Sequence, residues 1–161
     1  MDTYVKLAKD SIKYYLENEN YLTEYDDSFK ANNNGVIINI SQDDKNERSG
    51  SLYPTRADIG LDIIYEAINA TVFNNAIDMR DLDIDDLYIS VYEVTKIVPI
   101  QYLEDFGMYH GLSLKYKNEN VIVFRSDYES DYQMFEDALA KANVDSFDVF
   151  SLEKFKVTKH I

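Results

Sequence analysis

The segment 49–91 constrains the fold more than any other part of the chain, because it reads in order as a turn, a helix and a long strand. Gly50 and Pro54 bracket the turn, since both residue types interrupt regular structure. A wide apolar face over residues 56–73 then predicts a mostly buried helix, with Thr55 as its N-cap. After an acidic connection, the alternating residues 87–98 predict a strand that Pro99 stops.

The rest of the chain mixes the same two kinds of element. Helical periodicity and period-two alternation occur in turn, and Lys117-Asn118-Glu119 forms the turn of a predicted hairpin. The hairpin requires antiparallel pairing, so we expect an α+β fold in which an antiparallel sheet is flanked by helices. The remaining predicted elements are helices at 3–20 and 130–143, strands at 35–41, 111–116, 120–125 and 147–157, and a polar turn at 42–50.

Composition excludes several classes of function. The chain has 161 residues, which suits one domain with or without a small lobe. It contains no cysteine, so disulfides, thiolate metal sites and a cysteine nucleophile are excluded. Its net charge of −14, with no run of Lys and Arg, argues against nucleic-acid binding. No signal peptide and no membrane span are visible, so we expect a cytoplasmic protein. No complete metal-binding or nucleotide-binding motif occurs, so we expect no metal and no cofactor.

The blocks around the predicted turn and strand resemble the AMMECR-domain family. That family carries a pattern close to Gly-Thr-Leu-x-Pro-Thr-Arg, which Gly50, Leu52 and Pro54-Thr55-Arg56 fit. It then carries Leu-Glu-Ile-x-Val-Ser-Val, which residues 87–91 fit approximately. The resemblance implies one AMMECR-like domain over residues 1–161, an antiparallel sheet flanked by helices with a smaller lobe beside it.

The chain departs from the family just before the turn. Relatives usually carry Leu-Arg-Gly-Cys-Ile-Gly there, and alignment on Gly50 puts Asn46 and Arg48 where the family has its arginine and cysteine. The resemblance implies a protein of undefined molecular activity, an accessory or ligand-binding subunit that acts with Memo-like and radical S-adenosylmethionine proteins. The alternatives are a small enzyme acting on a polar small molecule in the groove next to the Gly50 turn, and a diverged paralogue that binds something new.

The turn supplies the candidate ligand-binding residues. Glycine allows backbone N–H groups to approach a ligand, hydroxyls add donors, arginines pair with carboxylates, and a helix N-terminus attracts anions. A purely structural turn explains the same residues, and the catalytic residues, if any, stay unknown. The candidates are Arg48, Ser49, Gly50, Ser51, Thr55 and Arg56.

Three weaker candidates lie elsewhere. Residues 81–86 begin like a calcium-binding EF-hand loop, but Asp86 stands where that loop needs glycine, which favours a solvated acidic connection. The carboxylates in 127–131 suit acid–base work or a polar loop. Of the two histidines, His110 is interpreted as an ordinary loop residue, and His160, one residue from the end, is expected to be mobile.

Overall fold

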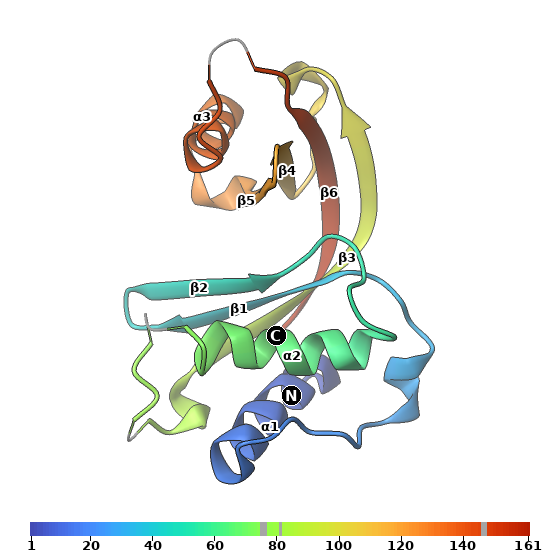
Figure 1. Ribbon diagram of the computed structural model, residues 1–161, viewed down its shortest axis with the longest axis vertical. Coiled ribbons are helices and arrows are strands. Elements are labelled where there is room, and N and C mark those ends of the chain that lie inside the picture. The colour runs from blue at the N-terminus through green and yellow to red at the C-terminus, as the bar shows by residue number, and fades with distance from the viewer. Residues whose placement is uncertain (75–76, 81, 146–147) are drawn as a thin grey trace. The chain divides into compact units, whose positions relative to one another are not determined.

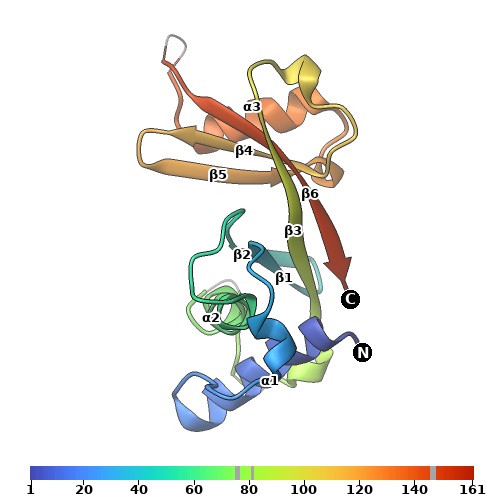
Figure 2. The ribbon, with the colours of Figure 1, turned by 90° about the vertical axis from the view of Figure 1, so that its right-hand side faces the viewer.

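Six strands form one sheet in the part of the chain that the computed structural model describes, residues 1–74, 77–80, 82–145 and 148–161 (Figures 1 and 2). The strand order is β2-β1-β3-β6-β4-β5, and the neighbouring strands are antiparallel. The strands are β1 (Val36–Gln42), β2 (Lys45–Gly50), β3 (Tyr88–Ile100), β4 (Gly111–Tyr116), β5 (Glu119–Phe124) and β6 (Ser151–His160). The predicted fold class, an α+β protein with an antiparallel sheet flanked by helices, is confirmed.

The chain divides into two compact units. Unit 1 comprises residues 1–94 and 158–161, and unit 2 comprises residues 95–157. In unit 1, α1 (Thr3–Asn18) packs on α2 (Ile59–Thr71), which packs on β1 and β2. In unit 2, α3 (Asp131–Lys141) packs on β4 and β5. Each unit buries its own apolar core, one rich in isoleucine and one centred on Phe106, Leu112 and Met134.

The helices begin and end for local reasons. Asp2 caps α1, because its carboxylate accepts the Tyr4 N–H at 2.7 Å. Ser130 caps α3 by accepting the Gln133 N–H at 3.1 Å. The predicted start of α2 is wrong: Asp58, not Thr55, is the N-cap, and it accepts the Leu61 N–H at 2.9 Å. The Thr55 hydroxyl is bonded elsewhere, as described below.

Two strand predictions also need correction. Residues 45–50, predicted as part of a polar turn, form β2, because backbone pairing with β1 needs no apolar side chains. Asp43, with a φ of 53°, makes the tight connection between those strands. Strand β3 continues through Pro99 to Ile100. The predicted hairpin is confirmed as β4 and β5, whereas Phe147, where the last strand was expected to start, lies outside the described residues.

Gly50 ends β2 in a conformation that requires glycine. Its φ is 149°, and a Cβ placed there would lie 2.2 Å from the Val36 carbonyl oxygen. The next residue, Ser51, donates its backbone N–H to that same carbonyl at 3.1 Å. The close approach of the turn to β1 therefore depends on the absence of a side chain at Gly50.

Candidate functional site

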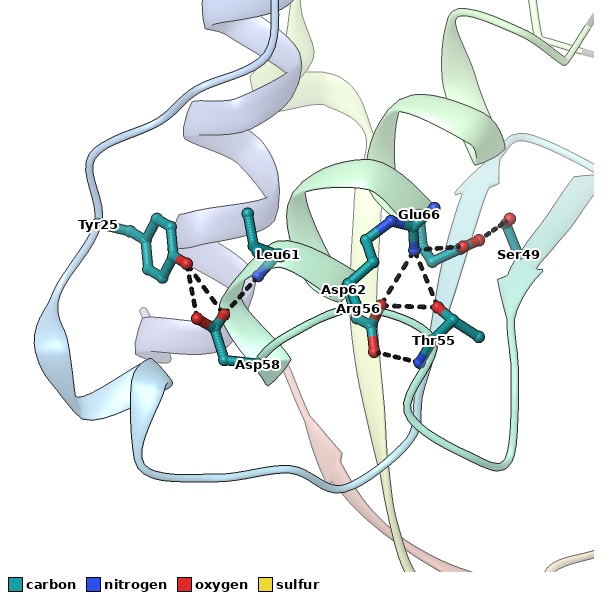
Figure 3. Close-up of polar contacts among 8 residues, drawn as sticks. All are labelled: Tyr25, Ser49, Thr55, Arg56, Asp58, Leu61, Asp62 and Glu66. Atoms are coloured by element: carbon teal, nitrogen blue, oxygen red, sulfur yellow. Dashed lines mark hydrogen bonds and ion pairs between the residues drawn. The ribbon is translucent and has the colours of Figure 1, made fainter.

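A polar network joins the predicted turn to the first two turns of α2 (Figure 3). Asp62 and Glu66 lie four residues apart and therefore on one face of the helix. Arg56 Nη1 donates to Asp62 Oδ1 at 3.0 Å and to Glu66 Oε1 at 3.1 Å. Thr55 donates to Asp62 twice, through its hydroxyl at 2.8 Å and its backbone N–H at 3.2 Å. The Ser49 hydroxyl of β2 donates to Glu66, which closes the network on the strand side.

The network is largely shielded from water. The side chains of Asp62 and Glu66 are 3% and 13% exposed, and that of Arg56 is 26% exposed. Burial lowers the pKa of Arg56, but the hydrogen bonds and charges of Asp62 and Glu66 outweigh it and raise the pKa above its usual value. The guanidinium is thus a permanent cation that two carboxylates neutralise in place.

Aromatic stacking fixes the outer side of the same arginine. The guanidinium carbon of Arg56 lies 4.5 Å from the ring centroid of Tyr65, in cation–π geometry. Tyr65 in turn stacks on Tyr21, with ring centroids 4.0 Å apart and planes 11° from parallel. Arg56 is therefore held between carboxylates and aromatic rings.

The N-cap of α2 carries a second, smaller contact. The Tyr25 hydroxyl lies 2.8 Å from Asp58 Oδ2 and donates its proton to that carboxylate. Figure 3 marks this contact. Burial, together with the bond to the negative Asp58, raises the pKa of Tyr25 to about 12. Asp58 therefore caps α2 and also binds Tyr25, which lies in the segment after α1.

The structure brings together only half of the predicted ligand-binding residues through their side chains. Ser49, Thr55 and Arg56 meet on the acidic face of α2 (Figure 3). Arg48 neighbours Ser49 in the strand and therefore faces the other side of the sheet, where its Nε donates to Asn39 Oδ1 at 3.0 Å. Gly50 and Ser51 contribute backbone to the pairing with β1.

Sequence reasoning missed the carboxylates and rings that organise this network. Asp62 lies within the largely apolar buried face of α2, and a buried carboxylate needs a partner. That position was the available signal for an ion pair with the preceding arginine. The stacking of Tyr21 on Tyr65 had no signal, since it joins residues of a loop and a helix that only the tertiary fold brings together.

His160, expected to be mobile, lies at the end of β6 within a second polar cluster of unit 1. Its Nδ1 lies 2.9 Å from Asp2 Oδ2, its Nε2 lies 3.2 Å from Glu93 Oε1, and its ring stacks 3.8 Å from that of Tyr4. Burial raises the pKa of Glu93, but bonds from Asn34, Asn32 and His160 outweigh it and hold the pKa below its usual value. The pKa of Asp2 is lowered in the same way against burial, through His160 and the N–H groups that Asp2 caps.

Two surface hollows lie away from the predicted turn. One, of about 460 Å³ in unit 1, is lined by residues that include Leu16, Val72 and Met79. The other, of about 440 Å³ in unit 2, is lined by residues that include Leu103 and Glu129. Glu129 is one of the carboxylates in 127–131 that suit either acid–base work or a polar loop, and its backbone N–H donates to Gln133 Oε1 at 3.1 Å. Asp81, the first residue of the weak calcium motif, lies outside the described residues.

Within the described ranges, no cluster of three or more His, Cys, Asp or Glu side chains is placed to hold a metal ion. No helix in that part of the chain has the length and apolarity needed to cross a membrane.

Comparison with known proteins defines the fold. No protein-family model matches the chain, and no curated protein matches its sequence. A crystal structure of an uncharacterized protein from Pyrococcus horikoshii is similar, with a TM-score of 0.74 and 15% sequence identity. The similarity covers 99% of this chain and 91% of the other. At that identity the likeness establishes a shared α+β fold and nothing about activity.

Proposed function

We propose that the protein is an AMMECR-like accessory subunit that binds another protein through the surface formed by Ser49–Arg56 and the Arg56–Tyr65–Tyr21 stack. The observation that carries this proposal is the stack itself: Asp62 and Glu66 hold the Arg56 cation, which lies over the Tyr65 ring, and that ring stacks on Tyr21. Tyr and Arg are the residue types that contribute most to protein interfaces, especially where they are held rigidly before binding.

The exposure of the turn supports the same proposal. Tyr53, in the middle of the turn, is 44% exposed although it is a large aromatic residue. Ser49, Thr55 and Arg56 each bond to a carboxylate of α2, which suits a firm contact surface better than proton transfer. The family resemblance supplies the candidate partners, a Memo-like protein and a radical S-adenosylmethionine protein.

Binding of each purified candidate partner to the full chain tests the proposal, measured by isothermal titration calorimetry. We expect saturable binding at or below about 10 μM, because interfaces of ordinary size have affinities from the micromolar range downwards. Tyr53→Ser should weaken it by about tenfold or more, as loss of an interface tyrosine does. Tyr88→Ser is the matched control, because Tyr88 is 54% exposed on β3 of the same unit.

Two results would contradict this function. One is the absence of binding to both partners at protein concentrations about ten times higher than the expected dissociation constant. The other is an equal loss of affinity in the Tyr53→Ser and Tyr88→Ser variants, which would place the contact elsewhere.

The second candidate function is a small enzyme acting on a polar small molecule beside the Gly50 turn. The observation that favours it is the hydrogen bond from the Ser49 hydroxyl to Glu66, because a carboxylate can act as base toward a hydroxyl nucleophile. Incubation with a metabolite extract, followed by mass spectrometry, tests this candidate. Depletion of a metabolite by the wild type but not by Ser49→Ala would favour the enzyme, and depletion by neither would leave the binding function.

We also propose that the protein acts in the cytoplasm and does not bind nucleic acid. The cysteine-free composition and the net charge of −14 support this proposal, because a polyanion would be repelled on average.

A further inference from the structure

Three lysine side chains surround one tyrosine ring in unit 2. The Nζ atoms of Lys154, Lys156 and Lys96 lie 4.1, 4.9 and 5.8 Å from the ring centroid of Tyr109. Lys154 and Lys156 are two residues apart on β6 and so project from the same face. Lys96 comes from β3, where the hydroxyl of the neighbouring Thr95 donates to the Lys156 carbonyl oxygen at 3.4 Å. The fold thus gathers three cations that are far apart in the sequence.

Within the described residues, no carboxylate neutralises the positive charge of this lysine cluster. Among the residues that the structure describes, no carboxylate forms an ion pair with Lys96, Lys154 or Lys156. Lys154 instead donates to the backbone carbonyl of Asp105 at 2.6 Å. The chain has 30 acidic residues and 16 basic ones, so partners of opposite charge are plentiful elsewhere. Like charges placed side by side on a sheet repel one another, and an anion bound among them would relieve that repulsion.

Tyr109 reports the electrostatic character of the cluster. A hydrogen bond with Lys96, together with the positive charges of Lys96, Lys154 and Lys156, lowers the pKa of Tyr109 against a smaller effect of burial. A lowered tyrosine pKa means that the surroundings favour an oxygen anion at the position of the phenol oxygen. The same surroundings would favour an oxygen anion supplied by a ligand.

The loop that carries Tyr109 is anchored by its neighbour. The backbone N–H of His110 donates to the Phe155 carbonyl at 2.9 Å, and the His110 carbonyl accepts from the Arg125 N–H at 2.9 Å. In addition, the Val157 N–H donates to His110 Nδ1 at 3.0 Å. Tyr109 is therefore held next to β6 before any ligand arrives, which lowers the ordering cost of binding.

We propose that the Lys96–Lys154–Lys156 cluster is a binding site for a small dianion of the phosphate or phosphomonoester class. Each ammonium offers three N–H donors, and a phosphoryl group carries about −1.5 to −2 charges at neutral pH with several acceptor oxygens. Three lysines suit a ligand with this charge better than a ligand with one carboxylate. A single carboxylate would leave two of the cations unneutralised. A long polyanion is disfavoured because the chain as a whole carries −14. The site lies within unit 2 and requires neither a protein partner nor the Gly50 turn.

Titration calorimetry of the full chain with inorganic phosphate and with glycerol 3-phosphate, at low ionic strength, tests the site. We expect saturable binding that the double variant Lys154→Gln, Lys156→Gln weakens by at least about tenfold, since two charge-assisted contacts are lost. The variant Lys6→Gln, Lys13→Gln removes the same charge from α1 in unit 1 and should leave the affinity within about twofold of the wild type. Tighter binding of glycerol 3-phosphate assigns the site to phosphomonoesters, and tighter binding of inorganic phosphate assigns it to the free ion.

A spectroscopic measurement separates binding at the lysine cluster from non-specific electrostatic attraction. Bound phosphate should raise the pKa of Tyr109, seen as a tyrosinate absorbance change that is missing in Tyr109→Phe. The proposal is overturned if neither probe binds saturably, if both double variants lose affinity equally, or if a short acidic peptide binds the lysine cluster and phosphate does not.

Discussion

Arg56 of unit 1 and the lysine cluster of unit 2 show two ways in which this acidic chain places its cations. Arg56 lies between Asp62 and Glu66, and its charge is neutralised beside the buried face of α2. Lys96, Lys154 and Lys156 gather around Tyr109, and within the described ranges no carboxylate pairs with them. A cation with buried partners is part of the fold, because removing either partner leaves a charge without solvation. Cations without such partners can be substituted at little cost to stability, so their placement says more about binding than the placement of Arg56 does.

The largest expected effect is the loss of the buried carboxylate of Asp62. Asp62→Ala removes the acceptor for the Thr55 hydroxyl, the Thr55 N–H and one bond of Arg56. We expect the free energy of unfolding to fall by about 3 kcal/mol, as for the breaking of other buried ion pairs. Urea denaturation of the purified variant measures it.

The control for this variant is Asp10→Ala. Asp10 pairs with Lys6 at 2.6 Å on the surface of α1, with both side chains largely exposed, so its removal should change the free energy of unfolding by less than about 1 kcal/mol. Similar losses in the two variants would mean that the Arg56 network is no more structural than a surface pair.

The second largest effect is expected from the loss of Asp58, the carboxylate that caps α2. Asp58→Ala removes the N-cap of the helix and the acceptor of the Tyr25 hydroxyl. We expect a loss of about 2 kcal/mol, the sum of a cap and one hydrogen bond to a charged group. Urea denaturation tests the size of this loss, and a variant as stable as the wild type would show that Asp58 does not act as the cap.

Alkaline titration gives a second test of the Tyr25–Asp58 contact. The folded pKa of Tyr25, about 12, lies above its ordinary value of 10.0, so the folded state retains a proton that the unfolded chain has lost. The contribution of Tyr25 to stability is therefore complete below pH 10.0 and is lost as the pH rises to about 12. Tyr25→Phe should remove this part of the pH dependence, and an unchanged alkaline profile would contradict the contact.

A smaller effect is expected where the two chain ends meet in unit 1. His160→Ala removes the contacts with Asp2, Glu93 and the Tyr4 ring, and should cost about 1 kcal/mol near neutral pH. The folded pKa values of Asp2 and Glu93 are lowered, so their contribution is present above the usual values of 3.8 and 4.5 and is lost as the pH falls through the folded values. Urea denaturation between about pH 3 and pH 7 should show a shallower acid loss in His160→Ala than in the wild type.

The control for the acid measurement is His110→Ala. His110 contacts β6 within unit 2 and, in the part of the chain that the structure describes, forms no hydrogen bond with Asp2 or Glu93, so the acid dependence should match that of the wild type. If His160→Ala also matched the wild type, the lowered pKa values of Asp2 and Glu93 would have to arise from other neighbours.

Patterns that repeat along the chain were predictable, and contacts between distant segments were not. The apolar stripe with Val5 and Ile12 in α1, and the alternation of β4, depend on neighbouring residues, so the sequence alone indicated both. Strand β2 was missed because its side chains are polar and its pairing uses the backbone. The start of α2 was misplaced because Asp58 and Thr55 are both good caps, and only the fold shows which one meets a free N–H.

The same distinction between local patterns and distant contacts applies to the candidate sites. The turn at Ser49–Arg56 was proposed as a ligand-binding segment, and that stays a prediction. Its acidic partners on α2 were not foreseen. The lysine cluster was invisible to a search for runs of basic residues, because Lys96 is on β3 whereas Lys154 and Lys156 are on β6. Only the order of strands in the sheet places these residues together.

The smallest expected effect on stability comes from a lysine of the cluster, and it completes the comparison with Arg56. Lys156→Gln should change the free energy of unfolding by no more than about 0.5 kcal/mol, because it removes no ion pair and relieves repulsion between neighbouring ammonium groups. The same substitution should raise the pKa of Tyr109, since the charge of Lys156 is one of the causes that lower it. Urea denaturation measures the free energy of unfolding. The pH dependence of the tyrosinate absorbance, less the part that remains in Tyr109→Phe, gives the pKa of Tyr109. A large loss of stability would show that the lysine cluster is as structural as the Arg56 network. A stable variant with a raised Tyr109 pKa would show that its charge is free to act on a ligand.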